Sequence, residues 1–463
     1  MSERGDHSTF RVLVFGADGA EILLTRSHAG VQLPEVTIPR WERLAENVTA
    51  EMKRSWGEVV VCLFELESSS DAGKSRYVAA RHLRTCDAAF SLLQWMTVTD
   101  LSDGVFTDPD DCRALRECAT KCRPSISTAE SGPFVRLNWF EELCGWISQS
   151  TAARRLYLTG DFRQLNASPT FSLIRFETNG PALWFKAVGQ PNEREFPITL
   201  EFVKTFPSYA PEFVAARPDW KGWLTFEAEG TNLAETADLS LWTNAAAALA
   251  KLQIASIDRC KPLLESGAHD LSPVTLNRTV SPFLAVIARL MREQTKIPPP
   301  VMSAEGLALL GERIREAVST LKQLEIPDTL GHLDLNPGNI ILSAQDRCVF
   351  LDWAEAYVGH PFYSFEYLLE HFRRLAGHDL VAEKTLTAAY LGPWMEMASR
   401  NLLMEAMALA PLVAAFAYGA GPDAWRRPER FRDPKIAGYL RSLVRRMDRE
   451  ANQLCERSTS CLS

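Results

Sequence analysis

The sequence predicts an α+β protein, because short apolar strands and amphipathic helices occupy different stretches of the chain. Strand-like runs such as "FRVLVFG", "EILLTRS" and "EVVVCLFELE" recur within the first 230 residues. From Leu239 onward the chain is mainly helical in pattern, apart from a hairpin near residues 340–351. Its 463 residues, 46% of them hydrophobic, suffice for several domains with their own cores.

Breaks in these patterns predict four segments. Residues 1–130 form a small α+β domain, and residues 131–150 form a linker helix with apolar positions at helical spacing. Residues 151–229 form a β-rich lobe, in which "NEREFPITLEFVKTF" is a helix with Pro197 in its first turn. Residues 230–463 form a large helical lobe.

The composition limits the partners and the setting. Fifty Lys and Arg against 58 Asp and Glu give a net charge of −8, so we expect no broad nucleic-acid-binding surface. Ten cysteines without a disulfide framework, and a first segment without an apolar leader, predict a cytoplasmic setting. The apolar run 401–421 contains Glu405 and Pro411, which favours a buried helix over a membrane span. The oligomeric state stays open.

One stretch, "GHLDLNPGNIIL" at residues 331–342, has the order H-x-D-x-x-x-x-N. It reads either as a phosphoryl-transfer loop or as a polar turn, since Asp, Asn, Pro and Gly are all turn formers. In the first interpretation Asp334 orients or deprotonates a hydroxyl, and His332 supports the loop by hydrogen bonding.

The residues after this stretch favour the catalytic interpretation. The runs "IIL" and "CVFL" predict an antiparallel hairpin, at whose open end Asn339 and Asp352 lie almost opposite each other. Cross-strand neighbours have Cβ atoms about 5 Å apart. Amide and carboxylate oxygens at that separation suit Mg²⁺, which usually keeps phosphate and water ligands as well.

A lysine within an apolar strand points to the same chemistry. Lys186 lies in "ALWFKAV", where its ammonium must either pair or reach a ligand. Glu193 and Glu195 begin the next helix, and one of them could hold Lys186. A solvent-facing lysine on an edge strand is the alternative.

Two weaker features complete the pattern. The turn "NASPT" at residues 166–170, around Ser168, offers backbone amides that could cap phosphates. The strand ending in "LTFEAEG" offers backbone groups that could bind a purine edge.

In this order, the motifs from about Tyr157 to the end resemble the aminoglycoside phosphotransferase and choline kinase-like family, which has a bilobal protein-kinase-like fold. The resemblance implies that Asp334 is catalytic and that Asn339 and Asp352 hold Mg²⁺. It implies a nucleotide site at Lys186, Glu195, Phe226 and Ala228, to which the turn chemistry adds Ser168 as a candidate. ATP is the implied phosphate donor, with GTP possible.

The sequence departs from the family pattern at two places. Leu333 replaces the glycine that usually follows the His, and Ser364 stands where an Asp is often found. These changes bear on loop support and substrate geometry. Glu366 and Glu370 are candidates for binding substrate amino groups, although a solvated helix face explains them equally well.

The predicted function is therefore ATP- and Mg²⁺-dependent transfer of a phosphate to a hydroxyl of a small molecule, such as an aminoglycoside, an amino alcohol or a sugar-like compound. The alternative is a non-catalytic nucleotide-binding sensor that acts through its N-terminal domain. A protein kinase is disfavoured, because no D-F-G segment is present and no A-P-E segment follows the stretch at residues 331–342.

Residues 1–130 resemble the Nudix fold in their strand order, through "FRVLVFGADGAEILLTRSHAGVQLPEV" and "LLQWMTVTDL". The catalytic helix of that family needs R-E-x-x-E-E-x-G. The corresponding "ENVTAEMKRSWG" lacks the paired glutamates that hold metal. We expect a specificity or docking module here, and no hydrolysis.

Overall fold

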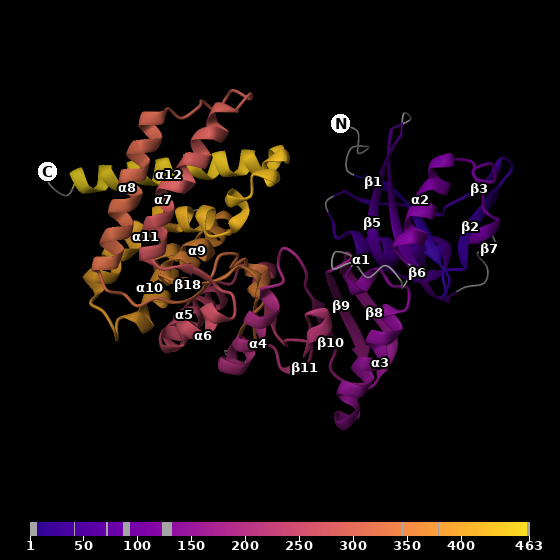
Figure 1. Cartoon of the computed structure of the whole chain (residues 1–463). Helices are drawn as coiled ribbons and strands as arrows, with labels where there is room; N and C mark the ends of the chain where they lie inside the picture. The colour runs from indigo at the N-terminus through magenta and orange to yellow at the C-terminus, as the bar shows by residue number, and fades with distance from the viewer. Residues whose placement is uncertain are drawn as a thin grey trace. The chain divides into compact units, whose positions relative to one another are not determined.

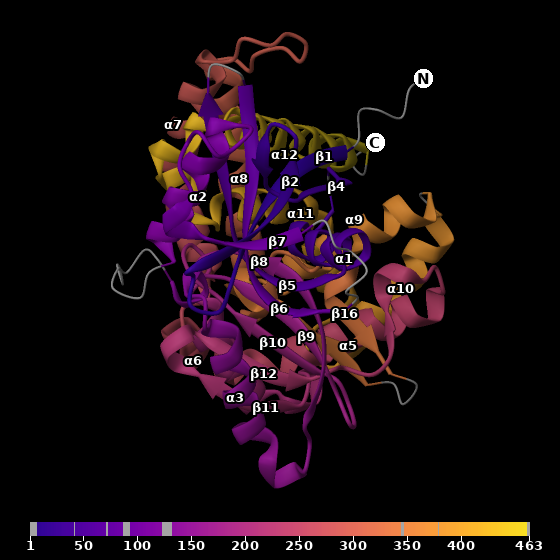
Figure 2. The same cartoon turned by 90° about the vertical axis from the view of Figure 1, so that its right-hand side faces the viewer.

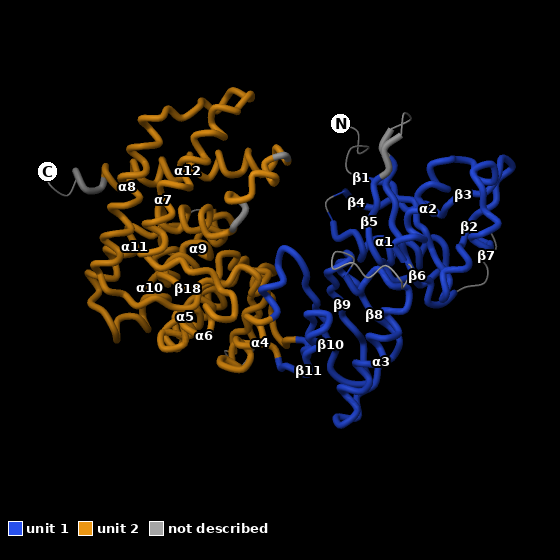
Figure 3. The backbone as a smooth tube through the Cα atoms, viewed as in Figure 1, with its two compact units in different colours: residues 1–196, 212–227 blue, residues 197–211, 228–463 orange. Residues whose placement is uncertain are grey.

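The computed structural model describes residues 7–40, 42–70, 73–86, 93–122, 132–343, 347–377 and 379–460. The chain divides into two compact units, Met1–Phe196 with Glu212–Glu227, and Pro197–Pro211 with Ala228–Ser463. Figure 3 colours the two units, and Figure 1 labels their elements. The division into four segments at residues 130, 150 and 229 stays a prediction.

The first unit begins with a seven-stranded sheet in which β1 (His7–Phe15) is central. Strand β1 pairs antiparallel with β2 and β4 and parallel with β6. The remaining strands are β2 (Glu21–Ser27), β3 (Gly30–Gln32), β4 (Glu35–Pro39), β5 (Glu58–Ser70), β6 (Gly73–Thr85) and β7 (Leu93–Thr97). The strands predicted at residues 10–16, 21–27 and 58–67 are thus confirmed.

Side chains along β1 alternate between the two faces of this sheet and contribute to a hydrophobic core on each face. Val12 and Val14 pack in a cluster with helix α1 (Leu44–Trp56), while Leu13 and Phe15 pack in a cluster with α2 (Pro109–Lys121). Successive side chains of a strand point to opposite faces. The sheet is therefore covered by a helix on each face.

A second sheet of five antiparallel strands follows, in the order β11-β12-β10-β9-β8. Strands β9, β10 and β12 lie side by side in Figure 2. The strands are β8 (Leu158–Ala167), β9 (Ser172–Thr178), β10 (Leu183–Ala187), β11 (Phe213–Arg217) and β12 (Gly222–Phe226). Helix α3 (Trp139–Thr151) precedes the sheet, and α4 (Glu195–Thr205) leaves it with Pro197 in its first turn, as predicted.

The two sheets of the first unit share one hydrophobic core. Phe134 contacts Trp139 and Phe185 edge-on, with ring centroids 5.0 and 6.5 Å apart. The buried side chain of Gln164 on β8 bonds both backbone groups of Cys62 on β5, at 2.9 and 2.7 Å. This amide satisfies backbone groups where a bulge interrupts the pairing of β5 with β6.

The second unit is mainly helical (Figure 1). Its principal helices after α4 are α5 (Leu239–Ser256), α6 (Cys260–Glu265), α7 (Pro273–Arg292), α8 (Ala304–Gln323), α9 (Phe362–Ala376), α10 (Leu380–Trp394), α11 (Arg400–Ala420) and α12 (Pro434–Ser460). They enclose one large hydrophobic cluster. Serine caps start α7, α8 and α11, where Ser272, Ser303 and Ser399 each accept a hydrogen bond from a backbone N–H of the first turn.

Helix α11 covers the apolar run of residues 401–421. It is the one helix in the described part of the chain that is long and apolar enough to cross a membrane. Its residues Leu403, Val413 and Phe416 belong to the core of the second unit, and the helix packs against α9 and α12.

Two small sheets in this unit carry the polar motif. Strand β15 (Thr329–His332) pairs with β18 (Ala356–Gly359), which also pairs with β14 (His269–Leu271). The predicted hairpin is present as β16 (Ile340–Leu342) and β17 (Cys348–Phe350), and β13 (Thr231–Asn232) extends it. The stretch 331–342 therefore connects the two sheets.

Close packing explains the glycine at position 331. Gly331 lies opposite Tyr357 in the β15–β18 pair, and a Cβ built on it would lie 2.0 Å from Tyr357 Cζ. We expect Gly331→Ala to displace the buried Tyr357 ring and to lower the free energy of unfolding by about 1–3 kcal/mol, the usual cost of overpacking. Denaturant unfolding of the full chain measures this.

The matched control is Gly392→Ala in α10, where a Cβ would meet nothing within 4 Å. Alanine is the better helix former, so the control should be neutral or slightly stabilising. Equal stabilities for the two variants would contradict the packing argument.

Candidate active site

The polar stretch forms a tight loop between β15 and β16. Pro337 begins the short 3₁₀ helix η9 (Pro337–Asn339), and Asn336 Oδ1 accepts a hydrogen bond from Gly338 N at 2.8 Å. Asn232 Nδ2 donates to Gly338 O at 2.9 Å, which ties the loop to β13. The turn-forming residues thus do shape a turn, and this turn positions the side chains of Asp334 and Asn339.

His332 holds the loop through both ring nitrogens. Its Nδ1 accepts from Asp334 N at 3.1 Å, so its Nε2 carries the proton and donates to Leu351 O at 3.2 Å. Complete burial lowers the pKa of His332, which keeps the ring neutral. The imidazole therefore joins the Asp334 backbone to the end of β17.

Asp334 is held at one carboxylate oxygen. Tyr367 Oη of α9 donates to Asp334 Oδ1 at 3.0 Å, and burial raises the pKa of Tyr367, which keeps this hydroxyl a donor. Among the described residues, no hydrogen-bond donor reaches Asp334 Oδ2. The carboxylate is thus oriented by Tyr367 and keeps an oxygen for a ligand.

The hairpin register places Asn339 next to Asp352. Ile340 pairs with Phe350, and Leu351 N donates to Asn339 O at 2.9 Å, so Asn339 lies opposite Leu351 and one position from Asp352. The predicted near-opposition is therefore offset by one residue. Asp352 has a left-handed backbone conformation, with φ 63°.

The donor chemistry at this end of the hairpin fits Mg²⁺. Asn339 Nδ2 donates to Asp334 O at 3.2 Å, so the amide is oriented with its Oδ1 left to act as a ligand. Together with the Asp352 carboxylate it offers the hard oxygens that Mg²⁺ prefers. No cluster of three His, Cys, Asp or Glu occurs among the described residues, so phosphate and water would complete such a site.

Ser364 supports the loop from α9. Its Oγ accepts from His332 N at 2.8 Å and lies 2.9 Å from Tyr357 Oη, and Ser364 N donates to that Oη at 3.1 Å. Both side chains are fully buried. A serine with a neighbouring tyrosine therefore holds the loop where an Asp is often found in the family.

In the first unit, Lys186 Nζ donates to Glu195 Oε1 at 2.6 Å. Only 15% of the Lys186 side chain and 2% of the Glu195 side chain are exposed, so the solvent-facing alternative for this lysine is wrong. Glu193 pairs instead with Lys221. Burial of both partners fixes the direction of the Lys186 ammonium.

The turn around Ser168 is closed on itself. Ser168 N donates to Phe171 O at 2.9 Å, and Ser168 Oγ accepts from Phe171 N at 3.0 Å. A Cβ on Gly189 would lie 2.2 Å from Thr170 Cβ, so the turn packs tightly on the end of β10. Phosphate binding by the Ser168 and Phe171 amides would require these internal bonds to open.

An ion pair holds the end of β12, the strand end that is predicted to bind a purine. Phe226 N donates to Glu212 O at 2.9 Å, and the boundary between the two units follows at Ala228. Between them, Glu227 accepts two hydrogen bonds from Arg175, at 2.7 and 2.8 Å. The nucleotide-binding roles of Phe226 and Ala228 stay predictions.

Glu366 and Glu370 lie on α9, beside the loop of Asp334. Glu366 is only 2% exposed and accepts from Arg373 Nη1 at 2.9 Å, so the solvated-face alternative is wrong for this residue. Glu370 pairs with Arg446 of α12. Both carboxylates are therefore already matched by guanidinium groups.

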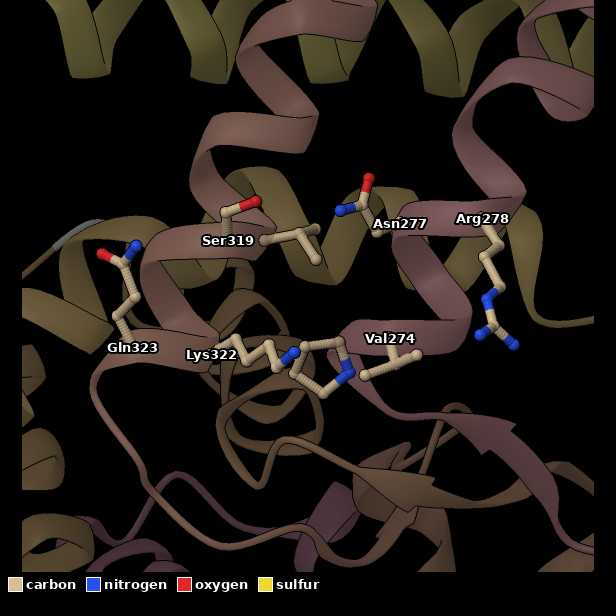
Figure 4. A pocket seen from close by; sticks show the side chains of 8 residues that line it. Val274, Asn277, Arg278, Ser319, Lys322 and Gln323 are labelled. Carbon is tan, nitrogen blue, oxygen red and sulfur yellow. The ribbon is translucent and has the colours of Figure 1, made fainter.

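Two cavities of the second unit are candidates for ligand binding. One of about 360 Å³ is lined by Leu333 of the loop and by α9, α11 and α12. The other, about 560 Å³, is open and lies between α7 and α8 (Figure 4). Its lining includes Arg278 and Lys322 but no residue of the stretch 331–342, and no lining residue has a buried polar atom without a partner.

The sequence did not indicate Tyr367, Tyr357 or the α12 arginines. Tyr367 and Tyr357 lie 33 and 23 residues from Asp334, inside segments whose pattern reads as ordinary core. Their contacts arise from helix packing, and no local motif marks them.

We expect Ser364→Ala to destabilise the loop, because the buried His332 N–H and the Tyr357 hydroxyl both lose a partner. A buried unsatisfied group costs about 1–3 kcal/mol. Chemical denaturation measures the loss, with Ser266→Ala as control, since Ser266 is partly exposed and bonds only Pro262 O within its own helix turn. A neutral Ser364→Ala would contradict the supporting role.

Stability should also depend on pH through Glu366. Burial raises its pKa from 4.5 to about 7. The folded state then binds the Glu366 proton more tightly than the unfolded state, so this contribution is complete below pH 4.5 and is lost as the pH rises to 7. Unfolding free energies measured from pH 4.5 to 7.5 should fall less steeply in Glu366→Gln, and an identical slope would contradict the assignment.

Part of the chain is similar to a known protein family. Residues 203–398 match the model of the phosphotransferase enzyme family. No curated protein matches the chain. The match does not extend to residues 1–130, so the Nudix resemblance there is not confirmed.

Solved structures similar to this chain include a phosphotransferase and two kinases. A macrolide 2′-phosphotransferase from Brachybacterium faecium is 15% identical, with 62% of this chain and 95% of that chain covered and a TM-score of 0.40. Choline kinase from Streptococcus pneumoniae is 13% identical, with 68% of this chain and 99% of that chain covered and a TM-score of 0.41. Plasmodium vivax ethanolamine kinase is 15% identical, with 72% of this chain and 96% of that chain covered and a TM-score of 0.44.

Because these TM-scores are low, the similarity to phosphotransferases depends on the family match and on the order of the sequence motifs. The α+β, kinase-like fold class is confirmed. The family match covers the loop of Asp334, the hairpin and α9, whose hydrogen bonds build the candidate site. Residues 203–398 of this chain are therefore similar to the phosphotransferase enzyme family.

Proposed function

We propose that the protein transfers the terminal phosphoryl group of a nucleoside triphosphate, ATP or GTP, to a hydroxyl group of a small molecule. The observation that carries the proposal is the Asp334 carboxylate, which Tyr367 holds at Oδ1 while Oδ2 remains available. It lies in the segment that matches the phosphotransferase family.

In this proposal Asp334 Oδ2 accepts a hydrogen bond from the acceptor hydroxyl and aligns its oxygen with the γ-phosphorus. A bond forms between that oxygen and the phosphorus, and the bond from phosphorus to the β,γ-bridging oxygen breaks. The hydroxyl proton passes to Asp334 and then to solvent, and the nucleoside diphosphate leaves.

Asn339 and Asp352 would hold Mg²⁺, which when bound supplies positive charge to the phosphate oxygens. Lys186, kept in place by Glu195, is proposed to contact the α- and β-phosphates. His332 has no chemical step in this proposal. Both of its ring nitrogens are used to hold the backbone.

We expect Asp334→Asn to reduce turnover by about 10²–10⁴-fold, the usual contribution of a positioned acid or base. Nucleotide affinity should change little, because the amide keeps the shape and the Tyr367 contact. Phosphate transfer from labelled ATP and GTP to a library of small hydroxyl compounds, together with nucleotide titration, measures both quantities.

The control is Asp258→Asn, which makes the same change at an exposed position outside the loop. It should leave turnover unchanged. Full turnover in Asp334→Asn would remove Asp334 from the mechanism. Nucleotide binding without transfer or hydrolysis by the unmodified protein would favour the sensor alternative.

A further inference from the structure

The residues that line the cavity beside Leu333 indicate which kind of molecule could accept the phosphate. One face of α9 lines it through positions 363, 366, 367, 370 and 374, and α11 and α12 form the other walls. Tyr367, which lines it, donates to Asp334 Oδ1, so the cavity adjoins the catalytic carboxylate. Its volume, about 360 Å³, is at the small end of the range for ligand pockets.

Aromatic rings form part of the lining. Tyr367 and Tyr418 are stacked, with ring centroids 5.4 Å apart and planes 18° apart, and Tyr439 approaches Tyr418 edge-on at 6.3 Å. Such a wall suits a compact body with an apolar or planar face. By itself it would also suit a cation, because a cation is attracted to the face of an aromatic ring.

The charged groups of the lining decide between these two ligands. Glu366 is paired with Arg373, and Glu370 with Arg446 and, at 3.7 Å, with Arg374. A substrate ammonium would have to displace a guanidinium to reach either carboxylate. The two acidic residues of the lining are therefore poorly placed to bind an amine.

Arginines outnumber these acids on the cavity wall. Arg374, Arg446 and Arg449 line it against Glu366 and Glu370, which gives a net charge of +1. Arg449 is exposed on α12 and makes no ion pair with any of the residues that the structure describes. Arg446 and Arg449 lie three positions apart on one helix, so they present their positive charge on the same side.

We propose that the phosphate acceptor is a compact hydroxyl compound that carries an anionic group, a carboxylate or a phosphate, beside an apolar or planar body. The anionic group binds Arg449, the body lies against Tyr367 and Tyr418, and the hydroxyl reaches Asp334. This substrate class rests on the proposed function, in which Asp334 orients the hydroxyl.

Three probes of one shape test the charge preference. They are 4-(hydroxymethyl)benzoate, 4-(hydroxymethyl)benzamide and 4-(hydroxymethyl)benzylamine, which carry a negative, a neutral and a positive group on the same hydroxymethyl ring. A hydroxymethylphenyl phosphate distinguishes a phosphate-bearing from a carboxylate-bearing acceptor. Binding to the full chain is measured by ligand-observed NMR with saturating Mg²⁺ and a non-hydrolysable nucleotide, and transfer is measured separately with ATP.

We expect the carboxylate probe, the phosphate probe or both to bind at least about 10-fold more tightly than the amine, a difference typical of close charge pairing. Arg449→Gln should reduce this preference about 5–10-fold and should act through KM where transfer is observed. Arg449→Lys should restore most of it. Arg292→Gln, the same charge change at an exposed position on α7, should leave the preference unchanged.

The outcomes separate this inference from the proposed function. Tighter binding of the amine, equal binding of all probes, or no binding of any probe would overturn the anionic acceptor, whether or not phosphate is transferred. An anion preference that depends on Arg449, in a protein that transfers no phosphate to any acceptor, would support the pocket chemistry and overturn the kinase function.

Discussion

The buried, neutral imidazole of His332 is the constraint on which the site depends. It accepts from the backbone of Asp334 and donates to Leu351 O, so one ring fixes the loop of Asp334 and the end of the hairpin to each other. Its ring also lies 5.1 Å from that of Trp353, which packs on Phe202. Because burial disfavours the charged form, the tautomer that makes both bonds is retained.

The support beneath this ring is built from hydroxyl groups. Ser364 receives the His332 N–H, and Tyr357 Oη bonds Ser364 and donates to His360 O at 3.1 Å. Gly331 leaves the space that the Tyr357 ring occupies. A carboxylate in this fully buried place would need a compensating cation, whereas the serine and tyrosine satisfy each other without charge.

Charge pairing changes the interpretation of α9. The spacing of Glu366 and Glu370 in the sequence is compatible both with amine binding and with a solvated face. In the folded chain Arg373 and Arg446 contact these carboxylates, and Arg449 adds a positive charge on the same cavity. The two acidic residues are thus engaged in ion pairs within the protein, and Arg449 supports the proposal that the cavity prefers an anionic group.

Much of the fold follows from local patterns in the sequence. The short apolar runs that predict β1 and β2 depend on neighbouring residues alone. The same is true of the helical spacing of apolar residues in α3 and of Pro197 in the first turn of α4. The hairpin register is local as well, which is why the proximity of Asn339 to Asp352 was predictable to within one position. The single core shared by the two sheets of the first unit was not predictable, since Gln164 and Cys62 are brought together from distant strands.

The sequence by itself determined the candidate site residues of this protein and their order: Lys186 and Glu195, then Asp334, Asn339 and Asp352. These residues lie in short segments whose turn and strand chemistry is encoded by their neighbours. Only the tertiary structure decided that Tyr367 orients Asp334, that Ser364 holds His332, and that α12 brings arginines to the cavity. Those contacts join segments far apart in the chain, and the packing of the helical core, which no local pattern specifies, creates them.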